Sequence, residues 1–503
     1  MLKSGFIVAS LTLLSRVFGL AREFFIAYSF GTSAIADCVN IAFKFPNLFR
    51  RIFGEGALSA VFIPIFSKKL LVSRDEAKKF SGSIFCILLI VLSVLTLILE
   101  ITMPYLMVII APGFYQNSEK FLLCITLCRI TTPYLIFLSI TALFGGMLNS
   151  VGRFWALSFA PVIMSATVII FTYYFQDYYT AHYSIAYSLI FAGILQIIFM
   201  VANLRKANLL FSFKIYRNDP AIPKFFNKMT PAAISSGAQQ LNLFISHSIS
   251  SFIPGAISIL SYADRLYQLP LALIGITFAT VLLPELSRLY KTKDYNKTNH
   301  LQNTSIKAAL LISIPAALGL FAMSEPIIYM IYERGEFIRQ DTIVTAKSLA
   351  AFSFGLPAFT LSKILLPIYY ANLDTKTPLR ITIYSIIINL ILSILLMIPF
   401  GVVGIAAGVS ISTWINVWWL ISGVKQFGNF KVQNSTKFFA IKTFISSLIM
   451  LSYIYVVDFY LHKYFFSTEL LVKLLSVFGV IASSMVVFGI SAIIFRLHKA
   501  INE

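Results

Sequence analysis

Five arginines lie inside long apolar stretches of this chain, where a charged side chain is costly. They are Arg16, Arg22, Arg50, Arg51 and Arg265. A guanidinium group keeps its proton, so within hydrocarbon it must face a partner, water or an anionic ligand. Insertion scales put the cost of each intramembrane arginine at roughly 2.5–3.5 kcal/mol. Several of them predict a polar chamber in the membrane, and planar guanidinium forks match phosphate oxygens.

Arg50 is the arginine whose surroundings most favour an anionic ligand. It shares a helix face with Asn47, and no acidic residue lies three or four positions away. Pro46 and Gly54 interrupt the same apolar stretch. Broken helices often line the substrate sites of transporters, so we expect a hinge at these two residues.

Arg51 belongs to a stripe of charged residues on another face of the same predicted helix. The stripe consists of Asp37, Lys44, Arg51 and Glu55, which are spaced 7, 7 and 4 residues apart. Seven residues make nearly two turns, and four residues allow a direct ion pair. The residues alone leave open whether this network only stabilises a charged face or also takes part in binding.

Arg16 and Arg22 lie in the first apolar stretch and point about 120° apart on a straight helix. Both can face one chamber only if the helix bends, and Gly19 between them permits a bend. Glu23, seven residues after Arg16, is a candidate partner for it.

The elements that position these residues are predicted to be membrane helices. The chain has 503 residues, of which 58% are hydrophobic and 12% charged, and its mean hydropathy is +0.84. Soluble domains carry about 25% charged residues. Windows of about 20 apolar residues predict an all-α polytopic membrane protein with about 14 transmembrane helices. The expected centres are Leu14, Leu48, Val91, Ile136, Val168, Leu189, Leu241, Ile274, Ser313, Phe359, Ile388, Gly408, Leu448 and Val480.

The connecting segments alternate between basic clusters and nearly neutral or acidic loops. With fourteen spans the basic clusters all fall on one side, which places both termini in the cytoplasm. The net charge of +20 is therefore explained by topology, and we expect no nucleic-acid partner. The segments on the other side include 31–36, 111–120, 252–258, the region of Glu333 and Glu336, and a turn at Gly401.

Prolines recur at a constant separation, which indicates an internal repeat. The pairs are Pro46 with Pro270 and Pro133 with Pro357, each 224 residues apart. We expect two six-helix lobes, at about 1–215 and 220–430, followed by two further helices in 431–503. Such transporters place their site between the halves.

Arg265 follows Asp264 in the second lobe and occupies the repeat position of the second span. It can contribute a guanidinium fork to the chamber from this lobe. The alternative is a residue near the end of its span that extends to the membrane interface. If it faces the chamber, the implied ligand is an amphiphile with a multiply charged anionic head.

Other chemistries find less support in the sequence. The cysteines at 38, 86, 124 and 128 lie in or beside apolar spans and are expected to be packing thiols, without a metal set. Neither a D-x-D motif nor a histidine cluster supports a metal-dependent enzyme acting on polyprenyl phosphates. A drug or oligosaccharide exporter, which would use Asp37 and Glu55, and a scaffold role stay open as alternatives.

The chain resembles the MurJ (MviN) family of lipid II flippases in the MOP transporter superfamily. The blocks that carry the resemblance are SRVFGLAREF at 15–24, DCVNIAFKFPNLFRRIFGEG at 37–56, APGF at 111–114, TTPY at 131–134 and YADRL at 262–266. The likeness runs from about residue 1 to residue 425. It implies a V-shaped arrangement of fourteen helices that works by alternating access, without a cofactor.

The resemblance also implies a substrate and its binding residues. Lipid II, undecaprenyl-pyrophosphate carrying a disaccharide-pentapeptide, would move from the cytoplasmic to the periplasmic leaflet of the bacterial inner membrane. The family arginines that meet the pyrophosphate map onto Arg16, Arg22, Arg50 and Arg265. Helices at about 438–459 and 470–495 would form a groove for the lipid tail. The expected partners are lipid II, membrane lipids and the cell-wall synthesis machinery, for a protein acting as a monomer.

Two departures from the family pattern limit this transfer. The family often has aspartate where this chain has Glu23. Some members resemble sodium-binding proteins with carboxylates in the seventh and eleventh helices, where this chain has Gln239, Gln240, Asn242 and Asn389. A sodium site is therefore not expected.

Overall fold

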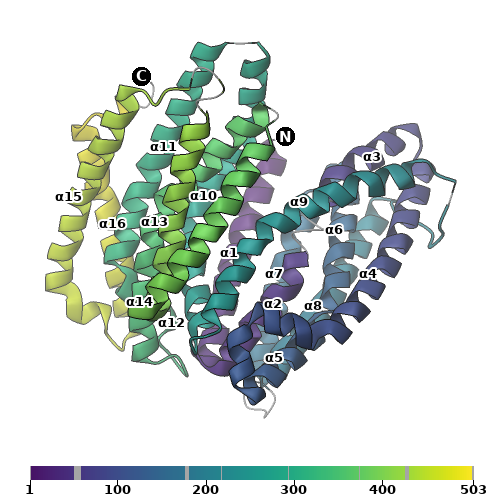
Figure 1. Cartoon of the computed structure of the whole chain (residues 1–503), viewed down its shortest axis with the longest axis horizontal. Coiled ribbons are helices and arrows are strands. Elements are labelled where there is room, and N and C mark those ends of the chain that lie inside the picture. The colour runs from purple at the N-terminus through teal and green to yellow at the C-terminus, as the bar shows by residue number, and fades with distance from the viewer. Residues whose placement is uncertain are drawn as a thin grey trace. The chain divides into compact units, whose positions relative to one another are not determined.

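The computed structural model describes residues 2–49, 58–175, 181–216, 218–292, 294–372, 374–424, 427 and 430–500. Every regular element within these ranges is a helix (Figure 1). The prediction of an all-α protein is thus confirmed. Each of the fourteen predicted centres lies in a helix of the structure.

The chain packs into two compact units, Met1–Ser258 and Ile259–Glu503. The helices of the first unit are α1 (Leu2–Phe30), α2 (Ala34–Phe49), α3 (Ser59–Val72), α4 (Arg74–Ile110), the short 3-10 helix η2 (Pro112–Gln116), α5 (Ser118–Thr131), α6 (Tyr134–Ser150), α7 (Trp155–Phe175), α8 (Ala181–Lys206), α9 (Ala221–Ser250) and the first turn of α10 (Ala256–Lys291). The predicted division at about 215–220 follows the sequence repeat, and it stays a prediction.

The second unit contains the rest of α10 and the helices that follow it. These are α11 (Tyr295–Ala322), α12 (Ser324–Tyr332), α13 (Arg339–Ala371), α14 (Lys376–Val424), α15 (Asn434–Phe465), α16 (Leu470–Ile494) and α17 (Leu497–Ala500). The largest packing interfaces in this unit join α13 to α14, α11 to α13 and α15 to α16.

Helix α14 is in fact two helices joined at Gly401. This glycine has φ 56° and ψ −132°, a conformation that ends a helix and that glycine adopts easily. The two halves fold back on each other and come so close that a side chain at Gly404 would overlap the carbonyl of Leu396. The predicted turn at Gly401 is therefore confirmed, and it separates the predicted eleventh and twelfth spans.

Nine helices in the described ranges are long and apolar enough to cross a membrane. One of them, α4, spans 37 residues. At 1.5 Å per residue this length exceeds the roughly 30 Å of hydrocarbon in a bilayer. The chain is therefore a multi-pass membrane protein, and the total of fourteen spans stays a prediction.

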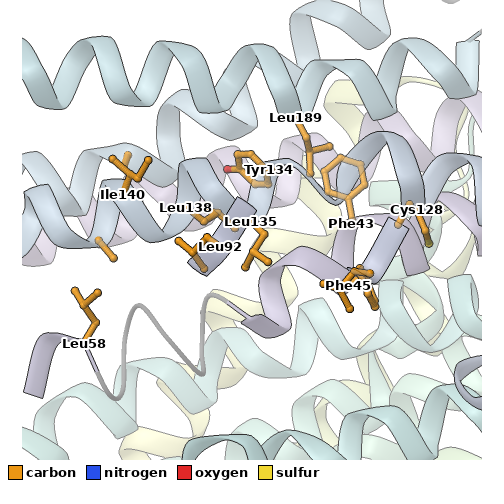
Figure 2. Packing of buried hydrophobic residues seen from close by; sticks show 14 of the residues in the cluster. Phe43, Phe45, Leu58, Leu92, Cys128, Tyr134, Leu135, Leu138, Ile140 and Leu189 are labelled. Atoms are coloured by element: carbon orange, nitrogen blue, oxygen red, sulfur yellow. The ribbon is translucent and has the colours of Figure 1, made fainter. Parts of the chain in front are cut away.

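The core of the first unit fixes α2, which carries several of the predicted site residues. Phe43 and Phe45 of α2 are buried in the same cluster as Tyr134 and Leu135 of α6 (Figure 2). Leu189 of α8 is fully buried in this cluster as well. Burying such a side chain contributes roughly 1.5–3 kcal/mol, so this cluster holds α2 against α6 and α8.

Candidate functional site

Arg22 lies buried in α1 as half of an ion pair. Its Nη2 atom is 2.6 Å from Oε1 of Glu23, the next residue, and the two residues are only 7% and 6% exposed. The guanidinium carbon also lies 5.1 Å from the ring centre of Phe43 on α2. A buried charge needs a partner, and here a carboxylate and an aromatic face supply it. The cation thus lies between Glu23 and α2, and the polar chamber stays a prediction.

Arg16 lies on the same helix, six residues before Arg22, and is partly exposed. Helix α1 continues through Gly19, where an added methyl group would meet nothing within 4 Å. Packing therefore does not require glycine at this position. The bend expected there, like the pairing of Arg16 with Glu23, stays a prediction.

Pro46 interrupts the hydrogen bonding of α2, as expected of a proline within a helix. It has no N–H to donate to the carbonyl of Ala42, four residues earlier. The Oγ1 hydroxyl of Thr131, on α5, donates to that carbonyl at 2.9 Å. One residue later, Nδ2 of Asn47 donates to the carbonyl of Phe43 at 2.8 Å. Helix α2 continues through Pro46 to Phe49, and the hydrogen bond that the proline cannot donate is supplied by Thr131 of α5.

Asp37, near the start of α2, is fully buried and accepts four hydrogen bonds. The donors are Nζ of Lys120 at 2.7 Å, the backbone N–H groups of Gly255 at 2.9 Å and Ser258 at 3.0 Å, and the Ser258 hydroxyl at 2.8 Å. The carboxylate therefore caps the first turn of α10, where the helix dipole favours a negative charge. We call Asp37, Lys120, Gly255 and Ser258 the Asp37 lock.

The surroundings of the Asp37 lock are closely packed. Nζ of Lys120 lies 3.9 Å from the ring centre of Phe114. Gly255 has φ +76°, and a side chain there would come within 2.5 Å of the Thr32 carbonyl oxygen. The backbone N–H of Gly113 donates to the hydroxyl of Ser251 at 2.9 Å. Three loops predicted to lie on the extracytoplasmic side are thus packed closely together inside the first unit.

The predicted charged stripe is only partly described. Asp37 does take part in an ion pair, but with Lys120 of α5, which the sequence analysis did not consider. Lys44 lies on α2 and is partly buried. Arg50, Arg51, Gly54 and Glu55 fall outside the described residues, so the rest of the stripe and the glycine hinge stay predictions.

Arg265 belongs to the second unit, on the part of α10 that packs on α13. Tyr267 stacks on Phe352 with ring centres 5.3 Å apart, and it lies 5.4 Å from Phe359. The carboxylate of Asp264 accepts a hydrogen bond from Nε2 of Gln268, one turn further along. Arg265 itself is partly buried. The contacts of Tyr267 with Phe352 and Phe359 therefore fix the turn of α10 that carries Arg265.

The polar groups described above are arginines, lysines, carboxylates and hydroxyls. In the ranges that the structure covers, no three His, Cys, Asp or Glu side chains are grouped so as to hold a metal ion. The arginines and lysines among these groups carry a permanent positive charge, which can bind and orient an anion.

Comparison with known proteins identifies similar sequences over almost the whole chain. The family model described as lipid II flippase MurJ matches residues 26–477. The probable lipid II flippase MurJ of Rickettsia prowazekii (strain Madrid E) is 49% identical over 501 residues, covering 100% of this chain and 99% of that protein.

Solved structures give a consistent result. A lipid II flippase MurJ in an inward closed conformation matches with a TM-score of 0.81 and 29% identity, over 98% of this chain and 99% of its own. An inward-facing multidrug resistance transporter of the MATE family, within the MOP superfamily, matches with a TM-score of 0.65 and covers 90% and 99% of the two chains. At 14% identity the second likeness concerns the fold alone.

Proposed function

Because this chain belongs to the MurJ family of lipid II flippases, we propose that it moves lipid II from the cytoplasmic to the periplasmic leaflet. The membrane is the bacterial inner membrane, and both termini lie in the cytoplasm. Arg16, Arg22, Arg50 and Arg265 bind the diphosphate of the substrate. The protein works as a monomeric transporter and needs no cofactor.

The observation that carries the assignment of the site is the buried cation of Arg22 in a long apolar helix. An ionisable residue at membrane depth is expensive, and its commonest explanation is a substrate path. Arg16 adds a second permanent cation on the same helix, about 9 Å away along the axis. A diphosphate carries enough negative charge to interact with both, and guanidinium groups bind its oxygens through paired hydrogen bonds.

Glu23 has a supporting role in this proposal. Its carboxylate lies 2.6 Å from Nη2 of Arg22, and this ion pair fixes the orientation of the guanidinium group. When the diphosphate arrives, the anion competes with Glu23 for the same cation. The pair therefore orients the arginine before the substrate binds.

Transport requires two states that bind the substrate differently. The Asp37 lock is an element that such a cycle can use. Its bonds join α2, α5 and the start of α10 at the side predicted to be extracytoplasmic. We propose that these bonds persist while that side is closed and are exchanged for water when it opens.

The last two helices are proposed to receive the polyprenyl tail. The predicted segments 438–459 and 470–495 fall in α15 and α16, which pack against each other. Their outward residues are large and apolar, including Phe459 and Leu475 at 82% and 66% exposure. Such surfaces suit lipid chains.

The proposal is tested by replacing the resident flippase of a bacterium with this chain. We expect lipid II to reach the periplasmic leaflet, as measured by its accessibility to an impermeant probe in intact cells. Arg→Ala changes at the four positions should each stop this movement while the protein still inserts. The matched control is Arg288→Ala, because Arg288 is exposed and pairs with Glu285.

Failure of the unchanged protein to move lipid II would contradict the proposed activity. Normal movement in all four variants would instead contradict the site. Export of cationic dyes by the same cells, without movement of lipid II, would favour a drug exporter.

A further inference from the structure

A groove of about 660 Å³ lies within the second unit, between α13 and the second half of α14. Its floor is formed by alanine, valine and isoleucine side chains. On α13 these include Ala346 and Ala350, and on α14 they are Val403, Ala407 and Ile411, four residues apart. A spacing of four places them on one face of the helix. The result is a continuous apolar channel along two packed helices.

The floor of the groove is held rigidly. The hydroxyl of Ser410, on α14, donates to the carbonyl of Ala351 on α13 at 2.7 Å. One turn further, Nε1 of Trp414 donates to the carbonyl of Phe354 at 3.0 Å. These bonds fix the two helices at a constant spacing, so the groove is present before any ligand binds.

The length of the groove corresponds to one leaflet of a bilayer. Its lining on α13 extends from Ile343 to Phe354, which is about 16 Å of helix. The hydrocarbon region of a bilayer is about 30 Å thick in total. Glu325 of α12 also lines the groove, at the end near Arg339 and the turn between α12 and α13 that is predicted to be extracytoplasmic. The groove thus runs from the outer surface toward the middle of the membrane.

One cation stands at the side of this groove. Lys347 is exposed and lines it, about two turns from the start of α13. Glu325, the carboxylate in the same lining, is bound by Arg339, which also lies 3.4 Å from Glu333. In the described parts of the chain, no carboxylate lies within 4.0 Å of Lys347. The groove therefore offers a positive charge beside an apolar floor.

We propose that this groove binds a phospholipid of the extracytoplasmic leaflet with an anionic headgroup. Lys347 contacts the phosphate region, and one acyl chain lies on the floor formed by Ala346, Ala350 and Ala407. A lysine near the membrane surface can reach a headgroup with its long side chain while its stem stays in hydrocarbon. The ligand is a bilayer lipid rather than the transported substrate, because among the described residues Tyr455 is the only lining residue on α15 and the lining contains no residue of α16, whereas the proposed tail site is formed by α15 and α16.

The test measures binding of phosphatidylglycerol and of phosphatidylcholine with identical acyl chains to the purified full-length protein, by native mass spectrometry. The unchanged protein should prefer phosphatidylglycerol about fivefold, the effect of one lysine near an anionic headgroup. Lys347→Gln should abolish this preference, and Lys347→Arg should retain it. Ala350→Trp should weaken binding of both lipids, because the indole fills the floor.

Two matched controls separate the groove from general lipid contact. Lys376→Gln removes another exposed lysine, at the start of α14, and Ala202→Trp adds an indole to an exposed position of α8. Both should bind the two lipids as the unchanged protein does.

A preference for phosphatidylglycerol that survives Lys347→Gln would overturn the proposal, as would unchanged binding by Ala350→Trp. If Lys347→Gln and Ala350→Trp weaken binding of a polyprenyl diphosphate but leave binding of phosphatidylglycerol unchanged, the groove belongs to the substrate and the proposal is wrong. Because the readout is phospholipid binding, a failure of lipid II transport would leave this test unaffected.

Discussion

The carboxylate of Asp37 accepts a hydrogen bond of 3.0 Å from the backbone N–H of Ser258. The first residue lies on α2 and the second in the first turn of α10. The same carboxylate is paired with Lys120 of α5 at 2.7 Å. The buried carboxylate of Asp37 therefore neutralises Lys120 and caps the first turn of α10.

Replacement of Asp37 by Ala should strongly destabilise the first unit. It leaves the Lys120 ammonium and the N–H groups of Gly255 and Ser258 without their acceptor. Breaking a buried pair from one side costs about 3–5 kcal/mol. We expect a large drop in the thermal unfolding midpoint of the purified protein, and a smaller one for Ser258→Ala, which loses about 1 kcal/mol.

The double variant Asp37→Ala with Lys120→Ala isolates the ion pair from the other bonds. Removing both charges should cost less than the sum of the two single changes, because neither is left buried alone. Strictly additive effects on the unfolding midpoint would show that the pair contributes nothing.

Thr131 is expected to matter because of Pro46. Thr131→Val keeps the shape but leaves the Ala42 carbonyl without its hydroxyl donor, at a cost of about 1–3 kcal/mol. In a Pro46→Ala background, the new N–H at position 46 supplies that carbonyl and the cost should shrink. The measurement is the unfolding midpoint of the four proteins. Thr126→Val, which removes only an exposed bond within α5 at 2.9 Å, is the control.

An equal cost of Thr131→Val in both backgrounds would contradict this reading of α2. The hydroxyl would then stabilise the helix through its second bond, to the carbonyl of Cys128 at 3.1 Å.

Gly404 should tolerate no side chain. A methyl group there would overlap the backbone of Leu396, and relief requires the two halves of α14 to separate. Overpacking of this kind typically costs about 1–3 kcal/mol and can be larger. Gly404→Ala should lower the yield of folded protein and its unfolding midpoint. Gly479→Ala on α16, where nothing lies within 4 Å, should be neutral or slightly stabilising. Equal behaviour of the two variants would contradict the packing of α14.

Features that depend on local composition were predictable from the sequence. The helical spans follow from apolar runs, and the turn at Gly401 follows from a glycine between two of them. The buried charge of Arg22 could also be expected, because this residue lies within a long apolar stretch of the sequence. Its partner Glu23 is the adjacent residue, whereas the sequence pattern had suggested it for Arg16.

Contacts between distant segments were not predictable in the same way. Lys120 is 83 positions from Asp37, and Thr131 is 89 positions from Ala42. No helical spacing relates such residues, and the tertiary packing of α2 against α5 brings them together. Ser258 was missed for the same reason, since a serine in a predicted loop gives no sign of the carboxylate that it contacts.

The most direct test of the account is the affinity of the purified protein for lipid II in variants of the four arginines. Arg16→Ala, Arg22→Ala, Arg50→Ala and Arg265→Ala should each weaken binding about ten- to a hundredfold, the loss expected for hydrogen bonds to a charged group. Arg288→Ala should bind as the unchanged protein does. Undiminished affinity in the four variants would contradict the claim that these guanidinium groups hold the diphosphate.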